Sequence, residues 1–543
     1  MGKDKKRVIM IGLDGYESSI GNRLMDEGRM PHLAALRKKS ARWLLEHGEY
    51  RNTGLAWEQV SSGLAPDRSD RWSAVVLDPE TYKVRQQGAV NQPFASHIDA
   101  KTLVLDAPYF DLAAAPNCIG AVNWGATDPG VAPYCRPASL FEEIRERFGP
   151  YKGKEFIYAF LWPDAEKTRL AGQGLAAGVD QRTEVMQWLM TERLPDWDLA
   201  ITVISELHAA IEPMWHGMDP THPLHNHPSA PEAKRALEGV YEALDRHVGA
   251  VQAAAPDATV VCFAMHGMGE NDADVAGMVL LPEILYRMET GKTLYTAPRE
   301  WTELEDGIPI LPPHTPWDRA ILNAMRGGRA LRARRKIKRG FRSLYRRLRP
   351  EPMTEGDPVQ RNSGELYVPA VCYSHAWPEM RAFGFPAFYD GRIRINLEGR
   401  EARGRVPVTQ YAEVVDELVA MLRSLKDPRT GMPAVNEIQT PVADDPLSAH
   451  PTQSDITMSF VGTPAALEHP ELGIIGPAPF RRVGGHTGPY GVLYISDVNV
   501  VAGDHGVRSS FDVVPTIARL LGDEACVAYS GEPVNVPRYA MAG

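Results

Sequence analysis

The sequence predicts an α/β protein whose central sheet is mostly parallel and covered by helices on both faces. Short apolar runs alternate with longer amphipathic segments along most of the chain. Strands that alternate with helices form parallel sheets, because each helix returns the chain to the start of the next strand. With 543 residues, the chain is long enough for a large catalytic domain that carries an inserted subdomain.

Six short apolar runs have the length and composition of buried strands. The first, residues 7–13, follows a short basic stretch and runs into Asp14 and Gly15. Its apolar core of about six residues is too short for a signal peptide, so a first strand of the sheet is the better interpretation. The other predicted strands are residues 102–106, 155–160, 199–205, 259–264 and 491–496.

Segments with apolar residues three and four positions apart predict the helices. They cover residues 30–47, 139–148, 180–193, 231–254 and 410–424, and a last helix over 511–522 ends on a glycine. The regular pattern breaks at residues 290–370, which are rich in proline, and an alternating stretch at 391–397 predicts a strand with one polar face. We therefore expect a catalytic core of residues 1–285 and 456–543, with residues 286–455 inserted as a cap subdomain.

Charge and cysteine content narrow the class of protein. The formal net charge of −10 argues against a general nucleic-acid binder. No apolar stretch approaches the roughly 20 residues that a membrane span needs. The five cysteines are scattered, odd in number and without CxxC spacing, which indicates reduced thiols and a cytoplasmic location.

Polar residues follow several of the predicted strands directly, where open α/β sheets bind their ligands. They are Asp14, His208 with Glu212, His266 in Met265-His266-Gly267, and His486 in a glycine-rich loop before the last strand. His208 and Glu212 are four residues apart, so one helical turn presents both side chains to the same side. Imidazole with carboxylate suits zinc or another divalent transition metal. Each residue alone could equally cap a turn or lie on the surface, so only the set indicates a metal site.

The order of these residues resembles the alkaline phosphatase superfamily, and most closely a divergent bacterial-type member of its type I phosphodiesterase and nucleotide pyrophosphatase branch. Residues 8–15 (VIMIGLDG) resemble the first strand of that family with its metal-binding aspartate. Residues 53–66 (TGLAWEQVSSGLAP) are similar to its nucleophile segment, with Thr53 at the position of the nucleophile. Residues 391–406 and 511–522 resemble two further stretches of the family. The resemblance implies an alkaline-phosphatase-like three-layer sandwich.

The resemblance also implies a metal-dependent hydrolase that cleaves phosphodiester or phosphomonoester bonds of a small molecule. In that family the Thr oxygen attacks phosphorus between two divalent metals. One metal would lie on His208, Glu212 and His486, and the other on Asp14, Thr53 and His266. Trp57 in the nucleophile segment and His216 in the histidine-rich stretch 215–227 are the expected substrate-binding residues, although a solvent-facing loop would explain that stretch equally well.

Two departures from the family pattern affect the metals. His208 and Glu212 stand where the family has Asp and His, and this exchange keeps a good zinc set of two His and one Glu. Met265 stands where the family has Asp, and a thioether is a poor ligand for such an ion. We therefore expect one tightly bound transition metal, zinc foremost, with a weak or empty second site. The alternatives are a one-metal lyase, transferase or non-phosphate hydrolase on the same scaffold, or a degenerate binding protein.

Residues 326–349 form the one segment that indicates a macromolecular partner. They contain twelve Arg or Lys and no acidic residue, with apolar residues interspersed. A solvated insertion and a basic amphipathic helix on an anionic membrane surface or phosphate-rich partner are both consistent with this pattern. The sequence indicates no specific nucleic-acid partner and no oligomeric state.

Overall fold

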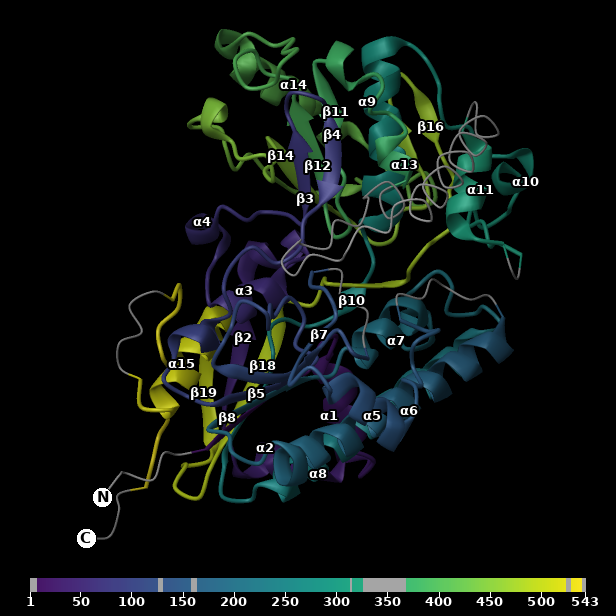
Figure 1. Ribbon diagram of the computed structural model, residues 1–543. Helices are drawn as coiled ribbons and strands as arrows, with labels where there is room; N and C mark the ends of the chain where they lie inside the picture. Colours follow the sequence, from purple (N-terminus) through teal and green to yellow (C-terminus); the bar gives the residue numbers. More distant parts are fainter. Residues whose placement is uncertain are drawn as a thin grey trace, which may run out of the picture. The chain divides into compact units, whose positions relative to one another are not determined.

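A computed structural model describes residues 7–125, 130–157, 164–312, 315–325, 368–523 and 529–539 (Figure 1). The chain divides into two compact units. The first comprises residues 1–72, 87–270 and 483–543, and the second comprises residues 73–86 and 271–482. The expected cap, 286–455, falls inside the second unit, which also takes in a hairpin from near the N-terminus. The basic segment 326–349 lies outside the described residues.

The first unit is built on a nine-stranded sheet. Its strands are β1 (Val8–Gly12), β2 (Ala41–Glu46), β5 (Thr102–Leu105), β6 (Cys118–Val122), β7 (Tyr134–Arg136), β8 (Leu199–Val203), β9 (Thr259–Ala264), β18 (Tyr490–Ser496) and β19 (Gly503–Ser509). They lie in the order β19-β2-β18-β9-β1-β8-β5-β6-β7. β1 pairs in parallel with β8 and β9, β5 with β6 and β8, and β19 with β2. Only β18, which pairs with β2 and β9, and β7, which pairs with β6, run antiparallel to their neighbours among the described strands of this sheet. The prediction of a mostly parallel sheet is therefore confirmed.

Helices cover both faces of this sheet (Figure 1). One face carries α1 (Ser18–Asp26), α2 (Pro31–Lys39), α5 (Leu140–Phe148), α6 (Ala165–Trp188), α7 (Glu206–Met214) and α8 (Ala230–Ala254), and the other carries α3 (Ala56–Ser62) and α15 (Val513–Leu520). Ile9 and Ile11 of β1 belong to the larger core under the first group, whereas Val8 and Met10 point the opposite way. Both faces of β1 are thus buried, as expected for a strand in a sheet between two helical layers.

The predicted helix over residues 30–47 is wrong in its second half. The helix α2 ends at Lys39, where the Ser40 hydroxyl donates to the Leu36 carbonyl, and β2 follows. In β2 the side chains of Trp43 and Leu45 are buried while Leu44 is exposed. This alternation has the period of a strand, and pairing with β18 holds it in the sheet.

The other predicted elements of the first unit have mixed outcomes. The strands at 102–106, 199–205, 259–264 and 491–496 are confirmed, and so are the helices at 139–148 and 231–254. The last helix begins later, at Val513. The helix at 180–193 is the end of the longer α6, which closes in a π-helical turn, Leu189–Arg193. Of the predicted strand 155–160, residues 155–157 form turns and the rest lies outside the described residues.

The second unit contains an antiparallel sheet in the order β11 (Ala382–Gly384), β12 (Gly391–Ile395), β14 (Ile456–Phe460) and β13 (Val435–Gln439). Two hairpins, β3–β4 (Val75–Asp78, Lys83–Gln86) and β15–β16 (Leu467–His469, Gly473–Ile475), accompany it. Its described helices are α9 (Leu281–Thr290), α10 (Arg299–Thr302), α11 (Trp317–Ala324), α13 (Val368–Val371) and α14 (Tyr411–Ser424). The predictions of a helix at 410–424 and a strand at 391–397 are confirmed.

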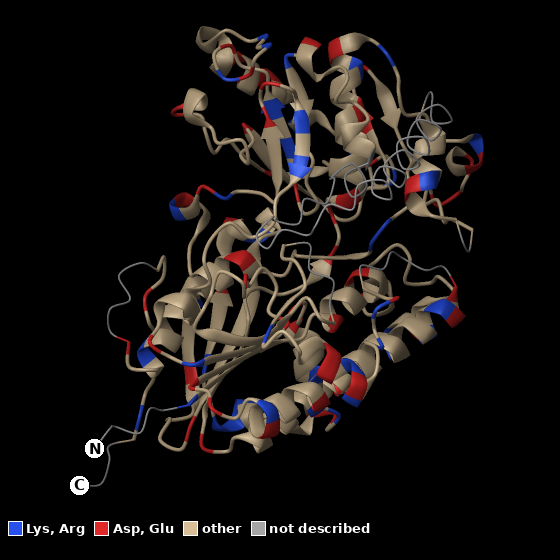
Figure 2. Ribbon diagram, viewed as in Figure 1, with Lys and Arg blue, Asp and Glu red and all other residues tan. Residues whose placement is uncertain are grey.

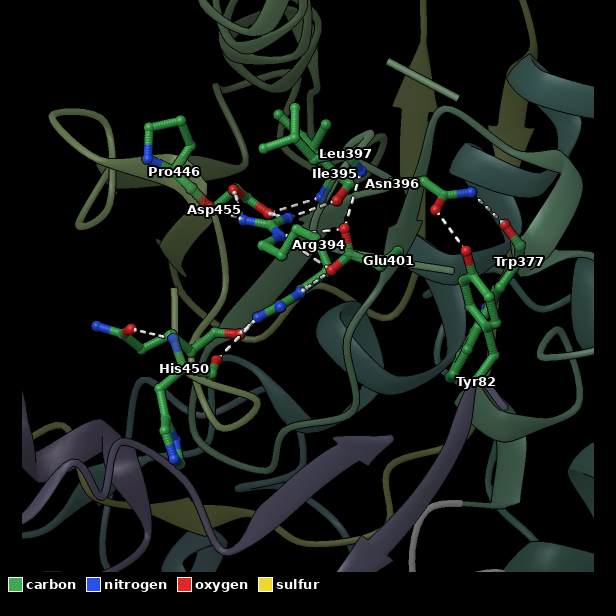
Figure 3. Close-up of polar contacts among 12 residues, drawn as sticks. Tyr82, Trp377, Arg394, Ile395, Asn396, Leu397, Glu401, Pro446, His450 and Asp455 are labelled. Atoms are coloured by element: carbon green, nitrogen blue, oxygen red, sulfur yellow. Dashed lines mark hydrogen bonds and ion pairs between the residues drawn. The ribbon is translucent and has the colours of Figure 1, made fainter. Parts of the chain in front are cut away.

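The polar face of β12 is buried and held by ion pairs (Figure 3). Arg394 donates from Nε to Glu401 at 2.9 Å, and Arg400 donates to the same carboxylate at 2.9 Å. Asp455 accepts from Arg400 at 2.8 Å and from the Ile395 N–H at 2.7 Å. The stretch 391–406, which contributed to the family resemblance, therefore stabilises the second unit.

Positively and negatively charged residues are intermixed along the helices that cover the first unit (Figure 2). Arg246 of α8 and Asp180 of α6, for example, form an ion pair at 2.8 Å. None of the helices in the described residues is both long and apolar enough to span a membrane. The four cysteines among these residues, Cys118, Cys135, Cys262 and Cys372, are free thiols.

The ion-pair cluster under β12 allows a stability prediction. We expect Glu401→Gln to lower the free energy of unfolding by about 3 to 5 kcal/mol, because two buried guanidinium groups lose their shared carboxylate. Glu417→Gln is the matched control, since Glu417 pairs with Arg381 on the surface and should change stability by less than about 1 kcal/mol. Chemical denaturation of the full chain measures both values. Equal effects of the two substitutions would contradict a stabilising role for the buried cluster.

Candidate metal centre

Five neighbouring strands of the large sheet bring polar residues to one edge. β1, β8 and β9 are parallel, so their carboxyl ends lie together. β18 is antiparallel to β9 and begins at this edge, and β2 is antiparallel to β18 and ends there. The residues just beyond these strand ends are Asp14 after β1, His47 after β2, Glu206 to Glu212 after β8, His266 after β9, and His486 before β18.

His208, Glu212 and His486 converge at this edge. Their potential ligand atoms all lie within 4.8 Å of one another. His208 Nε2 is 3.0 Å from His486 Nε2 and 3.5 Å from Glu212 Oε1. Glu212 is buried, whereas both histidines are half-buried. The sequence predicted that His208 and Glu212 share a metal site with His486. The geometry is consistent with that prediction.

This donor set fits a divalent transition metal. Ligand atoms bound at about 2.0 to 2.2 Å in a tetrahedral site lie roughly 3.3 to 3.6 Å apart, which is close to the two observed separations. Two imidazoles and one carboxylate leave one coordination position for a further ligand, as in catalytic zinc sites. His208, Glu212 and His486 therefore could hold one such ion.

Helix α7, which carries two of the three groups, is fixed at its first residue by a buried ion-pair cluster. Arg182 donates to Glu206 at 2.8 Å and to Asp106 at 2.9 Å, and Tyr151 donates to Glu206 at 2.6 Å. A Cβ atom at Gly15, whose φ is +77°, would lie 2.5 Å from the His208 Cα. Only glycine allows the β1 loop to approach the helix so closely.

Backbone pairing positions the His486 loop. The two-residue strand β17 (Gly484–Gly485) pairs with β10 (Gly269–Glu270), which follows the His266 loop. The Val483 N–H donates to the Glu212 carbonyl at 2.8 Å. His486 is therefore held against both α7 and the segment after β9.

Asp14 lies in an environment that disfavours its charge. Burial raises its pKa, and Glu212 and Glu206 add to this shift, whereas His208 and the Trp57 indole oppose it. Trp57 packs against the end of β1, where a Cβ at Gly12 would lie 2.3 Å from its ring. A substrate-binding role for Trp57 stays a prediction.

His266 lies beside His486, with ring centroids 4.7 Å apart. Its Nδ1 is 2.8 Å from the Gly267 carbonyl oxygen. Because a carbonyl only accepts, Nδ1 carries the hydrogen and Nε2 has the lone pair that a metal would need. Burial lowers the pKa of His266 to about 4, so the ring is neutral near pH 7. Met265, at the position of the expected carboxylate, is buried.

The Thr53 hydroxyl has all of its hydrogen-bonding capacity in use. It donates to the Tyr50 carbonyl at 2.7 Å, and it accepts from the Leu55 N–H at 3.2 Å and from Gln59 Nε2 at 3.1 Å. These bonds join the 3₁₀ helix η1 (Gly48–Thr53) to α3. An attack by this oxygen on phosphorus would therefore require the bond to Tyr50 to break.

Sequence reasoning missed His47, which directly precedes η1. Its ring is buried, stacks on Phe511 with centroids 5.2 Å apart, and lies 6.1 Å from the His266 ring. Its Nδ1 is 2.5 Å from the Ser510 hydroxyl. Burial lowers the pKa of His47 to about 3, while the side chain of Gln59 opposes the shift. Placing residue 47 at the end of a predicted helix concealed its position at the strand edge.

His216 lies in a buried histidine cluster. Its Nε2 is 3.0 Å from the Ser229 hydroxyl, and its ring lies 6.3 Å from His222 and 6.5 Å from His227, centroid to centroid. The side chain has no exposed surface. The histidine-rich stretch is thus partly buried and partly exposed. Substrate contact by His216 stays a prediction.

The chain matches no protein-family model and no curated protein sequence. Two solved structures of phosphonoacetate hydrolase from Sinorhizobium meliloti 1021 are similar to it. The complex with phosphonoformate has a TM-score of 0.45 and 14% identity, and the complex with phosphonoacetate has 0.42 and 12%. Each match covers 96% of both chains. TM-scores below 0.5 assign neither a family nor an activity to this chain.

The converging donor set predicts metal content. We expect about one tightly bound transition metal per chain after dialysis, and its loss in His208→Ala and in His486→Ala, because two remaining ligands bind too weakly. His505→Ala is the control, since His505 is exposed on β19 and should leave the metal in place. Elemental analysis of the purified proteins gives the result. Retention of the metal in both site variants would show that the ligand set is wrong.

The histidine cluster predicts a pH dependence of stability. Burial, with the neighbouring His222, His227 and His225, lowers the pKa of His216 from 6.5 to about 3. Between these values the unfolded chain binds a proton that the folded chain does not, so stability falls as the pH drops below 6.5. The loss should be about 1.4 kcal/mol per pH unit.

Denaturation at about pH 7.5 and about pH 5 tests this dependence. His216→Asn should lower the pH dependence of the free energy of unfolding by about 1.4 kcal/mol per pH unit. The exposed control His505→Asn should show the same pH dependence as the wild type. An unchanged decline in His216→Asn would mean that His216 is not held neutral.

Proposed function

We propose that the chain is a metal-dependent hydrolase of phosphate mono- or diesters and a divergent member of the alkaline phosphatase superfamily. The observation that carries the proposal is the convergence of His208, Glu212 and His486 at the carboxyl edge of a mostly parallel sheet. Zinc is the ion that this donor set suits best. The sequence resemblance in residues 8–15 and 53–66 supports the reaction class.

A divalent metal supplies a Lewis acid that stabilises negative charge on a phosphoryl oxygen. The residues around it have distinct tasks in the proposal. Asp14, with its raised pKa, faces His208 and Glu212 and favours a cation between them. Neutral His266 directs Nε2 away from the Gly267 carbonyl and presents a lone pair to the centre. The Val483 N–H and the Glu206 ion pairs hold the two ligand-bearing segments in register.

Two candidates remain for the attacking oxygen. Thr53 is the candidate from the resemblance, and Gln59 Nε2 would help to hold its oxygen in place. Water is favoured by the observation that the Thr53 hydroxyl donates to the Tyr50 carbonyl and accepts two further hydrogen bonds. The second candidate function is thus a one-metal hydrolase on the same scaffold that forms no covalent intermediate.

Substitutions of Thr53 separate the two candidates. If Thr53 attacks, Thr53→Ala should lower kcat/KM on an aryl phosphate ester by about a thousandfold or more, whereas Thr53→Ser keeps an attacking hydroxyl and most of the activity. Metal content must be equal in all three proteins. A Thr53→Ala activity within about threefold of the wild type would identify water as the nucleophile. Wild-type protein that holds its metal but cleaves neither phosphate monoesters nor diesters would overturn the proposed function.

A further inference from the structure

Arg51 is a charged residue of η1, the segment that follows His47, and neither the family resemblance nor the metal site uses it. It lies in η1, four residues after His47 and two before Thr53. The residue is half-buried, and its Nε atom is buried without a hydrogen-bond partner in the described part of the chain. In the same residues Arg51 forms no ion pair.

Two buried arginines of the described residues have acceptors for their donors. Arg71 donates to Glu58 and to the Gln87 and Gly88 carbonyls, and Arg182 donates to Glu206 and Asp106. Removing a charge from water without pairing it destabilises a fold, so folds rarely keep such a group. The buried Nε atom of Arg51 has no acceptor in the described residues, so a ligand oxygen could supply one.

The charge of Arg51 affects His47 and His266. His266 follows Met265, the residue that stands where the family resemblance predicts a carboxylate. Burial is the main cause of the lowered pKa values of His47 and His266, and the positive charge of Arg51 lowers both further. The His266 ring lies 6.1 Å from His47 and 4.7 Å from His486, centroid to centroid. The ring of His266 thus lies between the η1 segment and the candidate metal ligands.

We propose that Arg51 binds the anionic oxygens of the substrate, in the half of the centre that lacks a carboxylate. The assignment rests on the proposed function, and it adds the chemical class of group recognised there: a tetrahedral oxyanion such as a phosphoryl group. A planar guanidinium donates two parallel hydrogen bonds to such a group, which a single ammonium does not match.

A purely structural role would have the opposite effect on stability. Substituting a structural arginine removes hydrogen bonds and destabilises the fold, as expected for Arg71. Substituting Arg51 removes an unpaired charge, so Arg51→Met should be at least as stable as the wild type while it binds anions more weakly. The combination of unchanged or raised melting temperature with weaker binding is specific to a ligand-binding role.

Calorimetric titration with inorganic phosphate tests the assignment on the full chain with its metal. We expect Arg51→Met to weaken phosphate binding about 10- to 100-fold, and Arg51→Lys to weaken it less, because lysine keeps the charge but not the paired donors. Arg145→Met is the control, because Arg145 is exposed on α5, and phosphate binding should not change. Elemental analysis must give the same metal content for every variant, and thermal melts give the stability.

Three outcomes separate this inference from the proposed function. Weaker phosphate binding in Arg51→Met, with equal metal and an unlowered melting temperature, supports the role of Arg51. Equal binding in Arg51→Met and wild type, or a lower melting temperature with unchanged binding, overturns the role of Arg51 and leaves the proposed function standing. Absence of phosphate binding to the metal-loaded wild type counts against both.

Discussion

The buried cluster of Arg182, Glu206 and Asp106 is the interaction on which the candidate centre depends. All three side chains are almost completely removed from solvent, so their charges are stable only together. Glu206 is the first residue of α7, and His208 follows it within the same turn. Asp106 follows β5 and Arg182 lies in the long α6, so the cluster ties the start of α7 to both the sheet and the helical layer. Residues outside the candidate ligand set therefore hold the start of the helix that carries His208.

Charge is distributed unevenly across the strand edge. On the α7 side, the carboxyl groups of Glu206, Glu212 and Asp14 are close enough for the first two to raise the pKa of the third. On the η1 side, burial lowers the pKa values of His47 and His266, and the positive charge of Arg51 contributes to both shifts. A cation is favoured on the first side and an anion on the second. Hydrolysis of a phosphate ester requires both environments within one centre.

Local patterns in the sequence predicted the central strands and most helices, because apolar periodicity reports burial directly. The strand edge followed from topology, and His208, Glu212 and His486 followed from spacing and resemblance. β2 was mispredicted because residues 41–46 form a strand through pairing with β18 and β19, whose paired residues lie more than 440 positions away in the sequence. The position of His47 depends on Ser510, 463 residues further on. No local pattern contains such contacts.

The polar face of β12 is a second feature that the sequence alone did not predict. The alternation at 391–397 predicts a strand with one polar side, but it cannot tell a solvated polar side from a buried one. Arg394 is buried because Glu401 and the carbonyls of His450 and Gln453 receive its donors. The role of a charged residue in a motif therefore depends on its partners. Arg394 has protein acceptors for its donors, whereas the Arg51 Nε atom has none in the described residues.

In the proposed function, Met265 and Arg51 have the same effect on the charge of the centre. A carboxylate at position 265 would help to bind a second divalent cation next to His266. A guanidinium opposes such a cation, because like charges repel. Losing the carboxylate and keeping Arg51 both disfavour the second ion, and together they leave a positive, half-buried donor for an anion. In the proposed function, Arg51 would replace the missing metal as the group that neutralises phosphoryl charge.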